Sequence, residues 1–411
     1  MAQHAHTSEE TDLLIIGAGP FGLSLAAYCT QRGIGYTLVG KPMEFWQTHM
    51  PDGMYLRSAC DWHLDPANTA TIERFLALQG RTAADVDPLS LQFYLSYAQW
   101  FQEQQQIAAL PLYVERLDRV EGAAYRYRAT LEDGRVLRAR HVALAVGFRY
   151  FKHLPPDLVG ILPRGRFSHT CDLVAFGALT GQRCLIIGGR QSAFEWAALL
   201  HEAGAAAVHL SFRHPPPAFA AADWSWVAPI VDAIAHNPSW FRHLPEHEQA
   251  AVVQRLWAEG RLKVEPWLAA RVQQPGISLW PRTRLVACDV QPGGELLVQF
   301  DSGERLVIDH IILATGYKVN IAQIPFLAKG NIAATLATHN GFPVLDEHLQ
   351  TNLPGLFITS MAANQDFGPF FAFTVSTRTS ATLIGAAIGS ESNDGLRSAQ
   401  TAPLRSGVAP P

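Results

Sequence analysis

The sequence contains two similar units, and this repeat constrains the fold more than any other feature. The segments 132–147 and 301–316 align without gaps, with Gly134 repeated at Gly303 (303 − 134 = 169). Upstream, the segment 12–22 is repeated at 183–193 with almost the same offset (188 − 17 = 171). Two independent segments with nearly equal offsets indicate a duplicated structural unit.

Each unit begins with an apolar strand, a glycine turn and a helical stretch, over 20–31 in the first and 191–202 in the second. In such a turn the first glycine allows a tight bend and the second lets the backbone approach a pyrophosphate. The third lets the helix pack on the strand, and the helix N-terminus directs N–H groups at the phosphates. The repeat therefore predicts two dinucleotide-binding sites.

Each unit also ends in a similar way, which defines the fold class. Turn signals at Asp133-Gly134, Gly293-Gly294 and Ser302-Gly303 separate alternating runs, which predicts a small antiparallel meander before a last parallel strand. The predicted fold is α/β, with two Rossmann-like dinucleotide-binding domains.

Composition excludes several classes of protein. The 411 residues carry a net charge of −4, whereas nucleic-acid binders usually present a basic face. No apolar run approaches the ~20 residues of a membrane span, and the polar start lacks a secretory pattern. The five cysteines are dispersed without a zinc-like pair. We expect a cytoplasmic protein with no metal, no membrane and no nucleic acid, and the sequence leaves homo-oligomerisation open.

These motifs resemble the two-domain flavoproteins of glutathione-reductase type. Within that group, the strand end Ala314-Thr315-Gly316-Tyr317 and the Gly-Gly-x-x-Ser-Ala turn at 188–193 are similar to class B flavin monooxygenases. The C-terminal pattern Asp366-Phe367-Gly368-Pro369 after Pro354-Gly355-Leu356-Phe357 is most similar to bacterial amino-acid or amine N-hydroxylases. The linker keeps Gly165 and His169 of the Baeyer–Villiger signature but has Pro163 and Leu173 at its aromatic positions, which makes that chemistry less favoured.

The resemblance implies an NADPH-binding domain inserted into an FAD-binding domain. It also implies that NADPH reduces FAD, that O₂ adds to the flavin as a C4a-(hydro)peroxyflavin, and that a small-molecule substrate receives the oxygen. The expected boundaries are 12–155 with 325–389 for the FAD domain and 156–324 for the NADPH domain, with a helical, tryptophan-rich insertion at 215–270. The ends, 1–11 and 390–411, are expected to be disordered.

Four sites depart from the expected pattern. The second strand of the first unit ends in Gly40-Lys41, where an acid should bind the adenosine ribose. Arg190 replaces the middle glycine of the second turn, and we interpret it as a guanidinium clamp on the pyrophosphate. Arg213 ends the next strand where NADH-binding domains carry an acid, so it favours NADPH. Ser360-Met361 stands where related reductases carry a Gly-Asp.

The candidate site residues follow from these motifs and from the resemblance. Arg57, His63 and Asp366 are candidate catalytic residues, although flavin and NADP would carry the chemistry. We expect the C-terminal helix to begin at Pro369 and to face the flavin. The cofactor-binding candidates are Gly17, Gly19, Pro20, Phe21, Gly22, Trp46, Leu56, Arg57, Gly188, Gly189, Arg190, Gln191, Ser192, Arg213, Thr315, Gly316, Phe367, Gly368 and Pro369.

The leading hypothesis is an NADPH- and FAD-dependent monooxygenase that oxygenates a heteroatom, with N-hydroxylation of an amine or amino acid favoured over sulfur oxygenation. One alternative is a flavin reductase or oxidase that passes electrons to a quinone, a protein or O₂. Another is a non-catalytic FAD-binding protein whose NADPH site is closed by Arg190. Dispersed cysteines argue against thiol–disulfide chemistry, which needs two nearby thiols.

Overall fold

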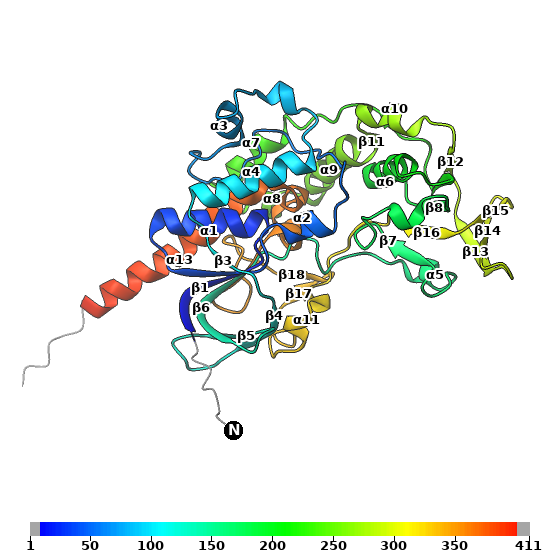
Figure 1. Cartoon of the computed structure of the whole chain (residues 1–411). Helices are drawn as coiled ribbons and strands as arrows, with labels where there is room; N and C mark the ends of the chain where they lie inside the picture. Colours follow the sequence, from blue (N-terminus) through cyan, green and yellow to red (C-terminus); the bar gives the residue numbers. More distant parts are fainter. Residues whose placement is uncertain (1–8, 401–411) are drawn as a thin grey trace, which may run out of the picture.

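The chain folds into two α/β domains that lie side by side (Figure 1). The structure, a computed structural model, describes the chain over 9–400, with side chains described as far as 390. The first domain is built around a mixed sheet with parallel central strands, and the second around a parallel sheet. No helix in this range is long and apolar enough to cross a membrane.

The first domain contains a seven-stranded sheet with the order β3-β2-β1-β6-β5-β4, and β19 pairs with β6. The central strands are parallel, whereas β4, β5 and β6 form an antiparallel meander. The long helices α1 and α13 pack against each other beside this sheet (Figure 1). The strands are β1 (Glu9–Ile16), β2 (Tyr36–Val39), β3 (Ala109–Leu110), β4 (Val114–Arg119), β5 (Tyr127–Leu131), β6 (Val136–Leu144) and β19 (Leu356–Ile358); the helices are α1 (Pro20–Arg32), α2 (Glu44–Thr48), α3 (Ile72–Ala77), α4 (Leu91–Gln104) and α13 (Thr377–Gln400).

The second domain contains a five-stranded parallel sheet with the order β12-β9-β8-β16-β7. A separate antiparallel meander, β13-β14-β15, precedes β16, which is the last strand of the parallel sheet along the chain. This meander forms the outer tip of the second domain (Figure 1). Both predicted meanders are thus confirmed. The elements are β7 (Phe167–His169), β8 (Arg183–Ile187), α6 (Gln191–Glu202), β9 (Ala207–Phe212), β12 (Ile277–Pro281), β13 (Leu285–Val290), β14 (Leu296–Phe300), β15 (Arg305–Ile308) and β16 (His310–Leu313).

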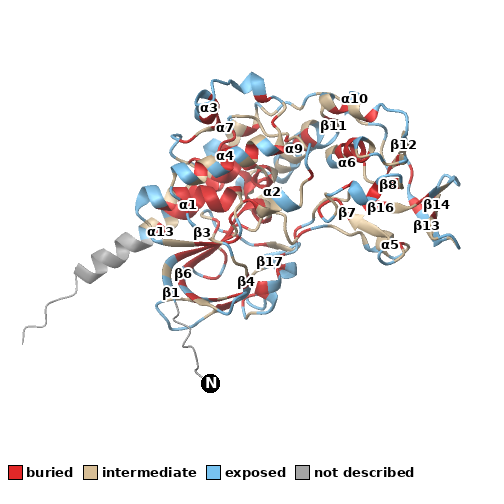
Figure 2. Cartoon of the chain, viewed as in Figure 1, coloured by how far each residue is buried: buried red, intermediate tan, exposed pale blue. Residues whose placement is uncertain are grey.

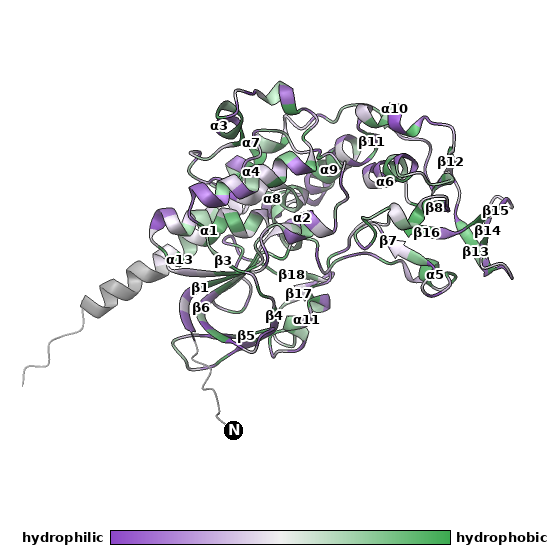
Figure 3. Ribbon diagram, viewed as in Figure 1, coloured by the Kyte–Doolittle hydropathy of each residue, from purple (hydrophilic) through white to green (hydrophobic). Residues whose placement is uncertain are grey.

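Burial explains why these strands have unbroken apolar sequences. Both faces of a parallel sheet are covered, so Leu13, Leu14 and Ile15 of β1 are fully buried (Figure 2). Figure 3 shows hydrophobic stretches in the inner strands and along α1, and hydrophilic residues on α4. The first sheet packs into one large hydrophobic core, whereas the two faces of the second sheet belong to separate cores, with Ile186 in one and Leu185 in the other.

The tryptophan-rich insertion is largely helical, as expected, and it packs on both domains, with Val264 and Leu268 buried in the core of the second. Val227 and Val231 of α7 share a buried cluster with Trp62, Phe370 and Val375, all of the first domain. The insertion therefore bridges the domains rather than extending only the second sheet. Its elements are β10 (Ala218–Phe219), α7 (Val227–Ile234), α8 (Trp240–His243), α9 (Glu246–Leu256), the π-helical turn η3 (Trp257–Arg261), β11 (Lys263–Val264) and α10 (Ala269–Val272).

The C-terminal helix differs from the prediction. It begins at Thr377 instead of Pro369, because two short 3₁₀ turns, Pro369–Ala372 and Thr374–Ser376, precede it, with Phe373 extended between them (φ −107°, ψ 160°). The helix continues to Gln400, whereas a disordered tail was expected from 390 onward. The rest of the predicted tail, 401–411, and the first eight residues lie outside the described residues; β1 already begins at Glu9.

Candidate cofactor and substrate site

The first glycine turn is close-packed at its first and third positions and open at its second. Gly17 has φ +113°, and an added Cβ would lie 2.4 Å from the carbonyl oxygen of Ala145. A Cβ on Gly22 would lie 1.8 Å from the carbonyl oxygen of Gly17. A Cβ on Gly19 would have no heavy atom within 4 Å. Gly17 and Gly22 thus serve the backbone packing, and the space beside Gly19 is left for a ligand at the N-terminus of α1.

The second turn repeats this geometry with one substitution. Gly188 has φ +148°, and an added Cβ would lie 2.5 Å from the carbonyl oxygen of Ala314. A Cβ on Gly189 would lie 2.5 Å from the Cβ of Phe212, so this glycine is also required by packing. Arg190 has an extended backbone (φ −111°, ψ −179°) that any residue adopts. Its side chain is accommodated without backbone strain, although it enters the space that a pyrophosphate would use.

A cavity of about 660 Å³ lies between the two turns, and it reaches into both domains. The structure brings together at its wall most of the predicted cofactor-binding residues. These are Gly17, Gly19, Pro20, Phe21, Trp46, Leu56, Arg57, Arg190, Gln191, Ser192, Thr315, Gly316 and Pro369. The other candidates, Gly22, Gly188, Gly189, Arg213, Phe367 and Gly368, do not line it: the three turn glycines support its floor through packing, Phe367 lies in the first core, and Arg213 is exposed.

A carboxylate that the sequence reasoning missed lies near the end of β2. Glu44, in the first turn of α2, lines the cavity and accepts a hydrogen bond from Nη1 of Arg149 at 2.7 Å. Lys41 lies 3.9 Å from its other oxygen, and the Lys41 and Arg149 cations both lie over the ring of Tyr113. This cluster fits the adenosine end of FAD. The signal was an acid four residues after Gly40, outside the strand end where it was sought.

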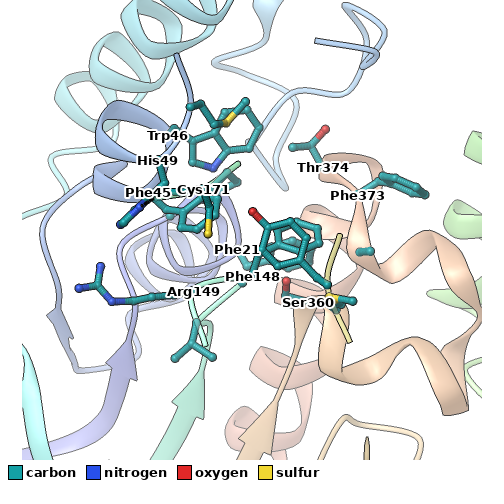
Figure 4. Close-up of a pocket in the computed structure, with 18 of the residues that line it drawn as sticks. Phe21, Phe45, Trp46, His49, Phe148, Arg149, Cys171, Ser360, Phe373 and Thr374 are labelled. Atoms are coloured by element: carbon teal, nitrogen blue, oxygen red, sulfur yellow. Dashed lines mark hydrogen bonds between the residues drawn. The ribbon is translucent and has the colours of Figure 1, made fainter. Parts of the chain in front are cut away.

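Aromatic and polar side chains from distant segments face each other across the middle of the cavity (Figure 4). Phe45 and Trp46 of α2 lie on one side with His49, the residue after this helix, and Ser360 and Thr374 lie on the other. Ser360 has φ +67°, and its buried hydroxyl has no hydrogen-bond partner. The buried Oδ1 of Asn364, also at the cavity wall, lacks a partner too. Buried polar atoms without partners are costly, so both are suited to bind a polar ligand edge such as that of a flavin.

Arg57 lies at the cavity wall but is held by the insertion. Its Nε donates to Oε1 of Glu265 at 2.7 Å, and its Nη1 donates to the carbonyl oxygen of Gly260. Its guanidinium lies 5.5 Å from the ring centre of Trp224, and its Nη2 is buried without a hydrogen bond. One donor group of Arg57 therefore remains available to a ligand.

Arg190 is also tied to the insertion. Its Nη1 donates to the carbonyl oxygen of Arg261 at 3.0 Å, and its guanidinium lies 5.2 Å from the ring centre of Trp257. Burial, and then the charge of Arg213, lower the pKa of Arg190, although it stays a cation at neutral pH. Two like charges near one turn favour an anionic ligand there.

His63 and Asp366 lie outside the cavity wall, where both have structural contacts. Nε2 of His63 lies 3.1 Å from Nη1 of Arg378, and burial followed by the charge of Arg378 lowers the pKa of His63 to about 4. Oδ2 of Asp366 accepts the backbone N–H of Leu345 at 2.8 Å, and burial raises the pKa of this carboxyl. A general acid or base must reach the reacting group, so the catalytic role of these two residues stays a prediction that their contacts do not favour.

The thiols give no sign of redox chemistry. All five cysteines are free, and Cys171 is the one that lines the cavity. Burial, followed by the charge of Asp172, raises the pKa of the Cys171 thiol to about 11, so it is protonated at neutral pH. The thiolate is the reactive form. In the part of the chain that the structure describes, no group of histidine, cysteine or carboxylate side chains could hold a metal ion.

Comparisons with known proteins agree with this arrangement. The sequence profile of the family described as "Pyridine nucleotide-disulphide oxidoreductase" matches residues 11–360. A ferredoxin–NADP reductase from Saccharopolyspora erythraea is 29% identical over 196 residues, which cover 47% of this chain and 51% of that protein. The aligned part thus spans about half the length of this curated relative.

Two solved structures share the whole fold. An ornithine N-hydroxylase from Kutzneria sp. 744, in a structure with reduced FAD, NADP⁺ and L-ornithine, has a TM-score of 0.75 and 15% identity, covering 93% of this chain and 100% of that one. The ornithine hydroxylase from Pseudomonas aeruginosa has a TM-score of 0.73 and 18% identity, covering 92% and 98%. These matches confirm the predicted two-domain flavoprotein fold, and the family match confirms an oxidoreductase that uses FAD and a pyridine nucleotide.

Proposed function

Because the chain belongs to the pyridine nucleotide-disulphide oxidoreductase family, we propose that it is an NADPH- and FAD-dependent monooxygenase that hydroxylates the nitrogen of a small amine or amino acid. The observation that carries this proposal is the chemistry of the cavity wall. The wall is rich in aromatic side chains, it joins the two nucleotide turns, and its one cysteine, Cys171, is a protonated thiol. Such a wall suits oxygen chemistry that must exclude water and does not suit disulfide reduction.

The fold supports the same reading. The ornithine N-hydroxylases from Kutzneria and Pseudomonas share the arrangement of both domains along their full length. A small-molecule substrate and O₂ as reactants, and a cytoplasmic location where NADPH is available, belong to the same proposal.

The residues of this chain would divide the work between binding and shielding. The N–H groups at the start of α1, beside Gly19, would bind the FAD pyrophosphate, and Glu44 with Arg149 would hold its adenosine end. The orphaned polar atoms of Ser360 and Asn364 would orient the flavin. When bound, FAD supplies the oxygen-activating redox chemistry and NADPH supplies the hydride.

NADPH binding would depend on the second turn. Arg190 would clamp the pyrophosphate bidentately, and the exposed Arg213 would attract the 2′-phosphate. Phe45, Trp46 and Phe148 would keep bulk water from the reacting centre, because they line the cavity between the two cofactor turns (Figure 4).

The test is a coupled turnover assay on the purified flavoprotein with NADPH in oxygenated buffer. A panel of amines, amino acids and thioethers is offered, and NADPH loss, hydrogen peroxide and hydroxylamine product are quantified. We expect one hydroxylamine for each NADPH with the preferred amine, and mostly peroxide without substrate. Sulfoxide formation alone would identify a sulfur oxygenase. Fast electron transfer to ferredoxin or a quinone, with no oxygenated product, would identify a reductase and refute the proposal.

A further inference from the structure

The turn η3 draws arginines from both domains to one end of the cavity. The carbonyl oxygen of Gly260 accepts from Arg57 of the first domain, and that of Arg261 accepts from Arg190 of the second domain at 3.0 Å. Arg261 itself lines the cavity, with its guanidinium 5.8 Å from the ring centre of Phe373. Three guanidinium groups therefore converge on one region.

This region has more positive than negative charge. Arg57 is paired with Glu265, whereas Arg190 and Arg261 have no carboxylate partner among the residues that the structure describes. Arg261 is exposed to solvent through the cavity yet enclosed by protein, and burial, followed by the charges of Arg57 and Arg190, lowers its pKa. An unbalanced cluster of this kind attracts an anion.

Negatively charged side chains are scarce along the wall of the cavity. Within the described part of the chain, Glu44 is the one acidic residue that lines the cavity, and Arg149 and Lys41 already neutralise it. A substrate with a second ammonium group, such as a diamine, would meet no free carboxylate. A substrate with an acidic group would meet the buried, unpartnered Nη2 of Arg57.

The surface beside the arginines is aromatic. Trp224 lies 6.0 Å from Trp62 and 6.0 Å from Phe373, measured between ring centres. A Cβ on Gly260 would lie 2.5 Å from the Trp224 ring, so the glycine permits this ring to pack against η3. Flat rings offer stacking surfaces to an aromatic or large apolar body. The wall residues of this aromatic-arginine subsite are Arg57, Trp62, Trp224, Trp257, Arg261 and Phe373.

We propose that the aromatic-arginine subsite selects an amine substrate that carries an acidic group on an aromatic or large apolar body, with Arg57 and Arg261 binding its carboxylate. This inference rests on the proposed function for the identity of the reacting amine. Arg190, at the middle glycine position of the second turn, is left to the NADPH pyrophosphate. The carboxylate of the substrate and the pyrophosphate of NADPH would thus be bound by different arginines.

Binding to the FAD-loaded protein tests the subsite without turnover. The probes are L-tryptophan and L-phenylalanine, their decarboxylated amines tryptamine and phenethylamine, and the dibasic L-ornithine and cadaverine, each titrated against the flavin absorbance and checked by calorimetry. We expect the aromatic amino acids to bind at least tenfold more tightly than either their decarboxylated amines or the dibasic probes. Equal or tighter binding of cadaverine or ornithine would overturn the proposal.

Variants separate substrate from cofactor. Arg261→Gln should weaken binding of the aromatic amino acid about tenfold and leave NADP⁺ affinity within twofold; Arg57→Lys should act in the same direction while it keeps a charge. Arg255→Gln is the matched control, because Arg255 also lies in the insertion and stacks on Trp226 but does not line the cavity. Loss of NADP⁺ binding with unchanged amino-acid binding in Arg261→Gln would assign the subsite to the cofactor phosphates and refute the proposal.

Failure of the inference is distinguishable from failure of the proposed function. If aromatic amino acids bind through Arg261 but no amine is ever oxygenated, the subsite stands and the monooxygenase does not. If dibasic amines are hydroxylated and Arg261→Gln has no effect, the monooxygenase stands and the subsite does not.

Discussion

The two glycine turns have the same backbone design, but only one of them carries a side chain in its open position. Gly19 (φ −83°, ψ −170°) and Arg190 (φ −111°, ψ −179°) are both extended, so neither position needs glycine for backbone reasons. The first position of each turn does, because Gly17 and Gly188 have positive φ and abut a carbonyl oxygen. The difference teaches that the middle glycine of such a turn is required by its ligand, whereas the first is required by the fold.

The helices that follow the turns differ as well. One turn into α1, Ser24 is buried, and at the equivalent position of α6 the buried residue is Glu195 (195 − 24 = 171). Oε1 of Glu195 accepts the backbone N–H of Tyr55 at 2.7 Å. Because Tyr55 belongs to the first domain and Glu195 to the second, the second helix holds the loop that carries Leu56 and Arg57.

The largest effect is expected when Gly22, the third glycine of the first turn, is replaced by the alanine that the second turn has there. Ala193 stands there in the second turn, but Gly22→Ala would place a Cβ 1.8 Å from the carbonyl oxygen of Gly17. Backbone cannot yield as a side chain can, so we expect a loss of at least about 3 kcal/mol of stability. Thermal unfolding and bound flavin absorbance measure it. Gly177→Ala, where a Cβ meets nothing within 4 Å, is the control; a yellow Gly22→Ala protein of unchanged Tm would show that the turn is not close-packed.

The next effect concerns the side chain that distinguishes the turns. Arg190→Gly restores the sequence of the first turn, and loss of a bidentate, charge-assisted contact worth about 1.5–3 kcal/mol should raise the KM for NADPH roughly 10- to 100-fold. Arg190→Lys should recover only part of this, because an ammonium group cannot bind two oxygens in the same plane. Steady-state kinetics at varied NADPH concentration measures the KM of each variant. A lower KM in Arg190→Gly would mean that the guanidinium obstructs the site.

The third effect is a pH dependence carried by Glu195. Burial, opposed by the Tyr55 N–H and then by the charge of Arg271, raises its pKa from 4.5 to about 8. The folded state thus holds a proton that the unfolded state releases above about pH 4.5. Stability should fall as pH rises from about 4.5 to about 8, by at most about 1.4 kcal/mol per pH unit, and then level off.

Glu195→Gln removes this titration while it keeps an oxygen for the Tyr55 N–H. The variant should therefore lose stability more slowly than the natural protein over the same pH range, as measured by denaturant unfolding at several pH values. Glu103→Gln, at an exposed carboxylate on α4, is the control and should keep the natural slope. Parallel curves for Glu195→Gln and the natural protein would remove Glu195 as the cause.

The smallest effect concerns Arg213, the residue that follows β9, which has no counterpart in the first unit. Its side chain is exposed, so its attraction for a 2′-phosphate is screened by solvent. Arg213→Ala should lower the preference for NADPH over NADH about five- to tenfold, chiefly through KM for NADPH. Identical ratios of kcat/KM for the two nucleotides in variant and natural protein would place the 2′-phosphate elsewhere.

The sequence predicted those helices and strands whose signals lie close together in the chain. The helix α6 begins and ends at the predicted residues, because a glycine turn, a helix and a following strand are neighbours in the chain. Both meanders were found for the same reason. The prediction that the C-terminal helix begins at Pro369 was wrong, because a proline that can start an α-helix can also start a 3₁₀ turn. The backbone is extended at Phe373, and the long helix begins at Thr377.

The cavity wall was less predictable, because its contacts join distant segments. Arg57 was recognised as a candidate, but its partners Gly260 and Glu265 lie more than 200 positions along the chain. Glu44 was missed because its carboxylate reaches the cavity from a helix and not from the strand end. His63 and Asp366 were chosen for their residue type near motifs, and only tertiary structure shows that their side chains are occupied by Arg378 and Leu345.

The position of β19 in the first sheet has a consequence for the order in which the protein is made. This strand, Leu356–Ile358, pairs with β6, and the helix that follows it packs on α1. The first domain is thus begun early in synthesis and finished last, whereas every strand of the second domain's parallel sheet lies between Phe167 and Leu313. All strands of the second sheet are therefore made before β19, and one side of β6 at Val142–Leu144 stays unpaired until β19 has been made.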